Sequence, residues 1–482
     1  LGVIALNTFL GFSQNELIRV EIDLKENYKN HEVFPLENKG LVLISNADKG
    51  KDDALEIKTD FYNTELQLID SKSVYIKDRS SVTKSYQENG INYSLFQNKR
   101  DYVAVVVSNS NDNTVKKIET TYSSDRYFSD IIAKHNKVYF TTINDKKEVL
   151  VIIDLESGSI KETPIEIDDV KFKDLTIKEF QVVEDEVIVY LNRRNSKTSS
   201  DIYIATLDLL GNLNDIINIT EGIDEKLISI AATKVDSKYI ITGTYSKTKS
   251  DMSQGIYLAE ISDKKIQFIK FYNFVDLNNF TSFMSDRNQR KIERRAEDAE
   301  KNDKEYLVNY NIKTHDIKVL DDGYTFIGEA YIPIHVYVNN GRIATRQFSG
   351  YSYSHAVICK FDFLGNMIWD NSLKMYPRSR TFYVKQFIRA SYFDNSVDLS
   401  FGDVNKLVYK KIDLVTGATL KDKDVEFVNI DLEGDKVRRT NNSLESWYDN
   451  YFVAFGTQVL TNSDAKGKRK VFFLNKVSFD KN

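Results

Sequence analysis

The stretch Val151-Ile-Ile-Asp-Leu-Glu-Ser-Gly158 decides the fold, because its pattern recurs along the chain. A β-rich run is followed by Asp, then Leu or Phe, then Gly within four residues, and a second β-rich run follows. The Asp side chain can cap a tight turn, and the Gly can take a positive φ. Each copy therefore predicts a strand, a turn and a return strand. Further copies occupy residues 204–211, 358–365 and 409–417.

Longer-range periodicity gives the architecture. Strongly β-forming central runs start at residues 41, 91, 138, 187 and 239, so they recur about every 50 residues. Three more start at residues 324, 397 and 452. A period near 50 with three or four strands per unit predicts an all-β chain folded as a single β-propeller of eight blades. Seven blades plus a cap is the alternative, because the run at residues 91–96 is weak.

Two insertions account for the longer spacings. The first, residues 276–306, ends in a run of mixed charges and predicts one inserted helix. Its apolar start consists of Leu277, Phe280, Phe283 and Met284 at helical spacing. The second, residues 331–355, is rich in Tyr, Gly and Asn and is interpreted as a loop. Both flank the central run at Tyr324, so we expect them to share one side or rim of the disc.

The two ends of the sequence suggest export and ring closure. Residues 1–13 are apolar, uncharged and too short to span a bilayer, which predicts the remnant of a secretory signal peptide. The propeller would then span residues 14–482. Within residues 14–24 an alternating pattern predicts a strand. We expect this strand to complete the last blade, which otherwise has three strands and an open edge.

Composition narrows the functional classes. The net charge is −5, so no global basic field indicates nucleic acid. No segment after the start has 18 uninterrupted apolar residues, so the mature chain is not expected to span a membrane. Cys359 is the single cysteine, and we expect it to be a buried apolar residue. An exported chain without disulfides suits a Gram-negative periplasm or cell surface.

No catalytic or metal motif is evident. The repeated residues Asp154, Asp208, Asp362 and Asp413 occupy equivalent hairpin turns, where turn capping is their expected role. No two of the five histidines lie within five residues of each other, so no His-x-x-x-His pair exists. His335 and His355 flank the second insertion and could meet in space. The sequence therefore predicts a non-enzymatic chain with no catalytic residue, metal or cofactor.

Aromatic residues and arginines concentrate in the second insertion and in residues 376–383. Such residues form the energetic centres of protein interfaces, and they can also stack on sugar rings. The alternative is that these aromatic side chains fold back onto the blade. The predicted partner-binding residues are Tyr337, Arg342, Arg346, Phe348, Tyr351, Tyr353, Tyr376, Arg378 and Arg380.

Two resemblances extend these predictions. Asp362-Phe-Leu-Gly-Asn-Met-Ile-Trp369 resembles the blade turn of quinoprotein-like propellers, including outer-membrane assembly lipoproteins. This resemblance implies a propeller but no quinone cofactor. The Lys-, Asn-, Ile- and Tyr-rich composition resembles that of propeller accessories of outer-membrane machines of the type 9 secretion kind, which implies an interaction module bound to an envelope protein complex. The alternatives are a propeller that binds a glycan or small ligand, and a carbohydrate-active hydrolase with carboxylates converging at the channel mouth.

Overall fold

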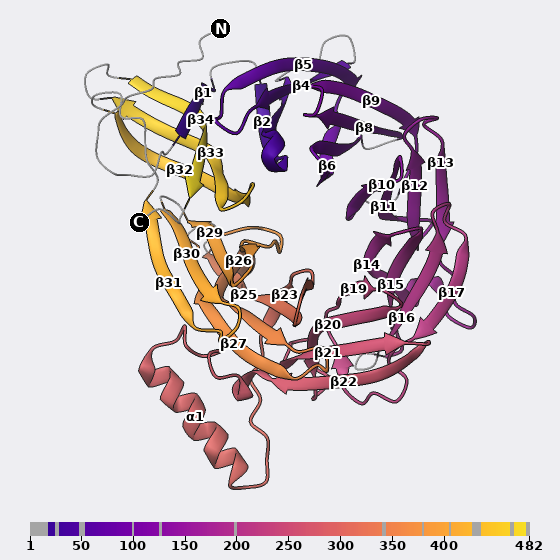
Figure 1. Cartoon of the computed structure of the whole chain (residues 1–482), viewed down its shortest axis with the longest axis vertical. Helices are drawn as coiled ribbons and strands as arrows, with labels where there is room; N and C mark the ends of the chain where they lie inside the picture. Colours follow the sequence, from indigo (N-terminus) through magenta and orange to yellow (C-terminus); the bar gives the residue numbers. More distant parts are fainter. Residues whose placement is uncertain are drawn as a thin grey trace.

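The computed structural model describes residues 18–24, 28–47, 54–98, 101–124, 128–196, 200–339, 344–377, 380–403, 406–426, 435–462 and 467–478. The expected signal peptide, residues 1–13, lies outside these residues. The described strands form eight antiparallel sheets arranged in a ring (Figure 1). In each of the first seven sheets the earliest strand lies nearest the centre and the latest lies at the rim (Figure 1). This arrangement is that of a β-propeller, as predicted.

Sheets 1 to 4 each contain four strands that are consecutive in the sequence. Their strands are β2 (Tyr28–Pro35), β3 (Leu41–Ala47), β4 (Ala54–Tyr62) and β5 (Leu68–Lys77); β6 (Ser81–Glu88), β7 (Ile91–Gln97), β8 (Tyr102–Asn109) and β9 (Thr114–Thr121); β10 (Ile131–Lys134), β11 (Lys137–Asn144), β12 (Lys147–Asp154) and β13 (Ile160–Pro164); and β14 (Leu175–Val183), β15 (Glu186–Arg194), β16 (Ser200–Asp208) and β17 (Leu213–Asn218).

In sheets 5 and 6 the innermost strand is divided into two short pieces, and sheet 8 borrows a strand from the start of the chain. Their strands, with those of sheet 7, are β18 (Lys226–Leu227), β19 (Ala231–Val235), β20 (Lys238–Ser246), β21 (Gly255–Ser262) and β22 (Lys265–Asn273); β23 (Asn311–Thr314), β24 (Lys318–Leu320), β25 (Gly323–Asn339), β26 (Ala344–Phe361) and β27 (Met367–Lys374); β28 (Arg389–Phe393), β29 (Ser396–Asp403), β30 (Lys406–Asp413) and β31 (Thr419–Glu426); and β32 (Asp435–Ser446), β33 (Tyr451–Asn462), β34 (Gly467–Ser478) and β1 (Ile18–Asp23).

All eight predicted central runs lie in the strand next to the innermost one of each sheet, namely β3, β7, β11, β15, β20, β25, β29 and β33. Neighbouring sheets cover both faces of these strands, so most of their residues are buried, including polar ones such as Asn92 and Asp398. The weak run at residues 91–96 is β7, a full member of sheet 2. Eight sheets therefore favour eight blades over the alternative of seven plus a cap.

The recurring Asp–Gly turns join the two outer strands of sheets 3, 4, 6 and 7. The Asp413 carboxylate accepts hydrogen bonds from the backbone N–H groups of Val415, at 3.0 Å, and Thr416, at 2.7 Å. Gly417 completes the turn with a φ of 73°. These hydrogen bonds, first of all the one from Thr416, lower the pKa of Asp413. The predicted capping role of the four Asp residues is thus confirmed, since Asp154, Asp208 and Asp362 each also accept a bond from the N–H two residues onward.

Strand β1 completes sheet 8, where it pairs antiparallel with β34 from Ile18 opposite Lys476 to Asp23 opposite Val471. Its apolar face, Ile18, Val20 and Ile22, packs in the core shared with Leu43 of sheet 1 and Phe472. The segment expected at the rim of the last blade therefore occupies that place.

The first insertion differs from its prediction. The helix α1 (Asp286–Glu300) begins later than expected, and the apolar residues before it are not helical. A short 3-10 helix, η3 (Phe274–Asp276), leads instead into turns, whose Asn278 and Asn279 N–H groups donate to the Asp370 carboxylate at 2.9 and 2.6 Å. Phe280 is fully buried. Two further 3-10 helices are η1 (Glu37–Lys39) and η2 (Phe172–Asp174).

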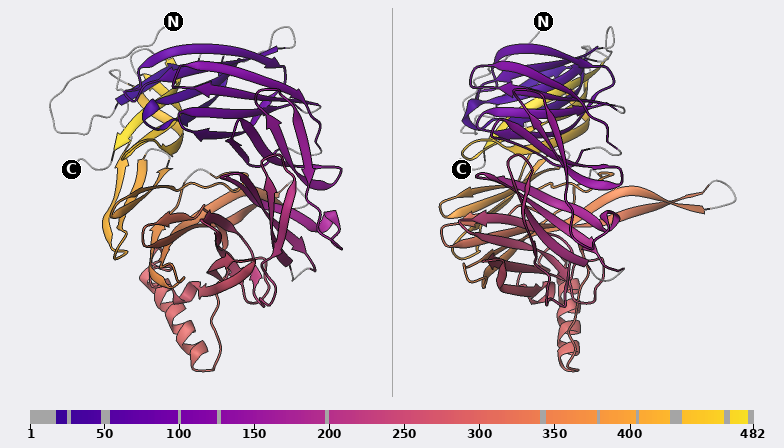
Figure 2. Two further views of the ribbon diagram at one scale, coloured as in Figure 1. Left: turned by 45° about the vertical axis from the view of Figure 1, so that its right-hand side comes forward. Right: turned by 90° about the vertical axis from the view of Figure 1, so that its right-hand side faces the viewer.

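The second insertion is not a loop. It is the continuation of β25 and β26, which extend beyond their sheet as a long hairpin (Figure 2). In the edge-on view the hairpin leaves one face of the disc, whereas α1 projects from the rim (Figure 2). The expectation that the two insertions share a side or rim is therefore wrong. Cys359, by contrast, is fully buried within β26, as expected.

Candidate functional site

The projecting hairpin consists of residues 331–339 of β25 and residues 344–353 of β26, and we call it the ribbon. Its strands pair with each other, with Tyr337 opposite Arg346 and His335 opposite Phe348. Because side chains alternate along a strand, these four side chains share one face. Arg346 donates from Nη2 to His335 Nδ1 at 3.1 Å. The ribbon thus presents a mixed aromatic and cationic face, with Tyr337 74% exposed.

A continuous series of aromatic contacts connects the ribbon to the core. Phe348 contacts Tyr351, whose ring centroid lies 5.0 Å away, and Tyr351 contacts Tyr331 at 5.4 Å. Tyr331 then contacts Tyr353 at 5.8 Å, and Tyr353 contacts the buried Phe387 at 4.7 Å. Aromatic pairs of this kind stabilise by about 1 kcal/mol each beyond the area that they bury. The ribbon is therefore held by its base and is not an independent arm.

The predicted partner-binding residues separate into groups. Tyr337, Arg346, Tyr376 and Arg380 are exposed, while Phe348 and Tyr351 are half-buried. Tyr353 is only 1% exposed, and its hydroxyl donates to the Lys385 carbonyl at 2.6 Å. Tyr353 is therefore a core residue and cannot present its ring to a partner. Arg342 and Arg378 lie outside the described residues.

The segment next to the ribbon adds exposed aromatic surface. The Tyr351 N–H donates to the Thr381 carbonyl at 2.8 Å, which places residues 380–383 alongside β26. Phe382 is 73% exposed and Tyr383 is 68% exposed. Phe382 also contacts Phe348, with ring centroids 6.3 Å apart. The patch predicted from the sequence is thus assembled from two segments, around the ribbon base.

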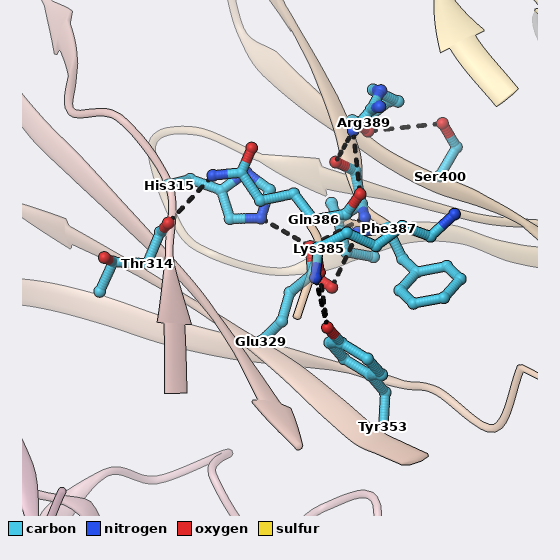
Figure 3. Close-up of polar contacts among 10 residues, drawn as sticks. Thr314, His315, Glu329, Tyr353, Lys385, Gln386, Phe387, Arg389 and Ser400 are labelled. Carbon is cyan, nitrogen blue, oxygen red and sulfur yellow. Dashed lines mark hydrogen bonds and ion pairs between the residues drawn. The ribbon is translucent and has the colours of Figure 1, made fainter. Parts of the chain in front are cut away.

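A buried carboxylate fixes this base. Glu329 of β25 is fully buried, and its Oε1 accepts hydrogen bonds from the backbone N–H groups of Phe387 and Ile388, both at 2.9 Å (Figure 3). Oε2 accepts a second bond from Phe387, at 3.0 Å. His315 places Nε2 2.7 Å from the same Oε1. These bonds give the charge of Glu329 the compensation that a buried carboxylate requires.

The Glu329 network joins sheets 6 and 7. Gln386, beside Phe387, donates from its side chain to the Thr314 carbonyl at 3.0 Å (Figure 3). Arg389, at the start of β28, continues the contact to sheet 8 through a two-bond pair with Glu445 at 2.5 and 2.6 Å. The segment that flanks the ribbon is therefore attached at both of its ends.

The sequence analysis did not identify Glu329, His315 or Arg389. The one available signal was an acidic residue within the apolar run that forms β25. An isolated charge in such a strand indicates a buried partner, but the partners lie far along the chain, at Phe387 and Ile388. Their identity could not be read from spacing.

Two carboxyl groups near the channel have raised pKa values. Burial raises the pKa of Glu32, on β2, to about 7. Glu32 lines an open cavity of about 370 Å³ together with Lys84, Arg389 and Glu445, from three other innermost strands. Burial also raises the pKa of Glu179, on β14, to about 8, with additional repulsion from Asp316 and Asp130. Burial is the sole cause of the Glu32 shift, so the two carboxyl groups do not act as a pair.

The Glu179 shift predicts a pH dependence of stability. The pKa of Glu179 in the folded chain lies above the reference value of 4.5. The contribution of this group to stability is therefore fully present below pH 4.5, and it is lost as the pH rises through about 8 and the buried carboxyl group ionises. We expect Glu179→Gln to raise the free energy of unfolding above pH 8 by on the order of 2 kcal/mol, and the gain to shrink toward about pH 5. Chemical denaturation across this range measures it. The exposed Glu166→Gln is the control, and equal effects of both variants would contradict the assignment.

The histidines do not form a site. His335 lies on the ribbon, whereas His355 lies in the core, stacked on Phe283 with ring centroids 3.8 Å apart. Burial lowers the pKa of His355 to about 3. His31 Nδ1 is 2.6 Å from Ser45 Oγ, and Ser45 is only 3% exposed. Within the described ranges, no three metal-ligating side chains cluster, and no helix is long and apolar enough to cross a bilayer.

Comparisons with known proteins concern the fold alone. No protein-family model and no curated protein matches the sequence. Among solved structures, the chain is similar to the polysaccharide lyase Uly1, with 8% identity, a TM-score of 0.41, and coverage of 83% of this chain and 90% of that one. A prolyl endopeptidase structure gives 7% identity and a TM-score of 0.41, with coverage of 91% of this chain, which spans 55% of that one.

A third similar structure is the β-propeller domain of the Trilobed protease from Pyrococcus furiosus. It has 11% identity and a TM-score of 0.34, with coverage of 83% of this chain and 99% of that one. Identities this low carry no statement about activity. The eight antiparallel sheets in a ring make this chain a β-propeller.

Proposed function

We propose that this chain is an exported β-propeller that binds a protein partner in the bacterial cell envelope through the ribbon, without catalytic activity of its own. The observation that carries the proposal is the ribbon itself, with exposed Tyr337 and Arg346 beyond a base held by the buried Glu329. A docking element fixed before binding loses less conformational entropy when it binds.

The chemistry of the exposed residues fits a protein interface. Tyr and Arg are the residues most enriched at interface hot spots, and each contributes about 1–3 kcal/mol when it is buried centrally. Tyr337 and Arg346 lie along the ribbon, and Phe382 and Tyr383 are exposed beside its base, where Phe382 contacts Phe348. They are large side chains that the described part of the chain leaves uncovered, which supports a partner surface.

The envelope location rests on the sequence. The apolar residues 1–13 have the character of a secretory signal, and a chain with one cysteine needs no disulfide outside the cytoplasm. Fractionation of cells that produce the full chain tests this part of the proposal. Recovery in the cytoplasmic fraction with residues 1–13 intact would contradict it.

Affinity purification from the envelope fraction tests the function. The variant Tyr337→Ala, Arg346→Ala, Phe382→Ala removes three exposed groups, so its unfolding free energy should stay within about 0.5 kcal/mol of the wild type. We expect it to lose the captured partner by at least about tenfold. The control variant carries Arg287→Ala, Lys291→Ala and Arg294→Ala on α1 and should retain the partner.

The possible outcomes separate the proposals. If the wild type captures no protein, or if the ribbon variant retains it fully, the ribbon is not the interface. Loss with the α1 variant instead would move the interface to the rim. Capture of polysaccharide by the wild type, lost in the ribbon variant, would favour the glycan-binding alternative.

A further inference from the structure

The ribbon and its flanking segment form a basic region in an acidic protein. About one residue in seven of the chain is Asp or Glu, 71 of 482, and the net charge is −5. Residues 330–361 and 371–393 nevertheless contain no acidic residue at all. Every charged side chain in these two segments is cationic. A partner that approaches the ribbon therefore meets a positive local field from its exposed arginine, Arg346, and from the neighbouring Arg380.

Three exposed cations of this region have no carboxylate partner among the described residues, namely Arg346, Lys374 and Arg380. Two less exposed cations of the same segments are paired, Lys360 with Asp322 and Arg389 with Glu445. Lys374 instead lies 5.4 Å from the ring centroid of Tyr376. Cations elsewhere are commonly paired, as Lys137 is with Asp154 at 3.1 Å. The free cations are available to a carboxylate from outside.

The ribbon also has an open backbone edge. Residue pairing along the outer side of β26 ends at Tyr351, which bridges to Thr381. In the described part of the chain, no strand pairs with the outer side of residues 345–349. The opposite edge, along β25, contains Pro333, which lacks an N–H donor. The β26 edge is therefore the better template for an added strand.

We infer that the partner presents an extended acidic segment, which adds as a strand to the β26 edge of the ribbon. This inference rests on the proposed function. Arg346 and Phe348 are two residues apart, so they lie on the same face of β26. The added strand then places a carboxylate beside Arg346 and, two residues away, an apolar side chain beside Phe348. Arg380 supplies a second cation next to the same edge.

Synthetic peptides titrated into the purified full chain test this inference. The probe is a short peptide of the repeat Glu-Thr-Val-Thr, which places Glu and Val alternately on one face. We expect saturable binding, weakened about tenfold by Arg346→Glu and unchanged by Lys291→Glu on α1. Methylation of the peptide's backbone nitrogens should weaken binding to a similar degree, because it removes the donors that pair with a strand edge.

The alternatives have separate readouts. Equal binding of the repeat Lys-Thr-Val-Thr would overturn the acidic character, and equal binding of the methylated peptide would overturn strand addition. No binding of the Glu peptide, or binding of polygalacturonate in its place, would overturn the inference as a whole. If envelope capture still depends on the ribbon in that case, the proposed function stands and this inference falls; if capture fails as well, both fall.

Discussion

Deletion of residues 1–24 is expected to abolish cooperative folding of the ring. The deletion removes β1, whose six residues pair with β34, and exposes the edge of β34 from Val471 to Lys476. It also uncovers the core between sheets 8 and 1, where Val20 and Ile22 pack. The lost burial and hydrogen bonds amount to roughly 5 kcal/mol or more, which is a large share of the stability of a typical domain.

A buried charge network makes this deletion more severe. Arg19 donates to Glu21 at 2.7 Å and to Gln458 at 2.5 Å, and Arg469 pairs with Glu21 at 2.8 Å. Without β1, Gln458 and Arg469 lose these partners. Deletion of residues 1–17 alone, which leaves β1 in place, is the matched control. Calorimetry should show that only the longer deletion loses the unfolding transition, and light scattering should show that only the longer deletion aggregates. An unfolding transition at the wild-type temperature for the deletion of residues 1–24 would refute the role of β1.

The second large effect is expected from Glu329→Ala. The substitution leaves the Phe387 and Ile388 N–H groups and the His315 ring without their acceptor in a buried place. Loss of one member of a buried charged network costs about 3–5 kcal/mol. Glu329→Gln keeps the shape and one oxygen acceptor, so we expect a smaller loss of about 1–2 kcal/mol.

Two measurements identify the mechanism of this loss. Chemical denaturation gives the free energies of unfolding, with Glu88→Ala as the control, because its pair with Lys134 is half-exposed and should contribute at most about 1 kcal/mol. Hydrogen exchange should show faster exchange of the Phe387 and Ile388 amides in Glu329→Ala. Unchanged exchange at these amides would mean that Glu329 does not hold the segment beside the ribbon.

Local signals in the sequence were sufficient for the repeat. Asp413 and Gly417 act within one turn, so their roles follow from neighbouring residues. The central strands were identified by short runs of β-forming residues that recur about every 50 residues. The ribbon was predicted to be a loop because its sequence is rich in Tyr, Gly and Asn. A period-two alternation was present in residues 335–338, where His335 and Tyr337 alternate with two valines, and it indicates a strand.

Long-range contacts explain the remaining errors. Leu277 and Phe280 have helical spacing, yet their segment adopts turns because Asp370, far along the chain, accepts its backbone N–H groups. Tyr353 was grouped with the surface residues, but its hydroxyl bonds to the Lys385 backbone within the core. Neither partner lies near enough in sequence to leave a pattern.

The pairing of Ile18 with Lys476 also constrains the order in which the molecule folds. Hairpins between consecutive strands have low contact order, so each of the first seven sheets can form soon after its own strands become available. The closing contact spans almost the whole chain and requires the last strand. A chain that emerges progressively, from a ribosome or a translocation pore, therefore carries its first strand unpaired throughout synthesis or transport. We expect ring closure to be the final and slowest phase of refolding.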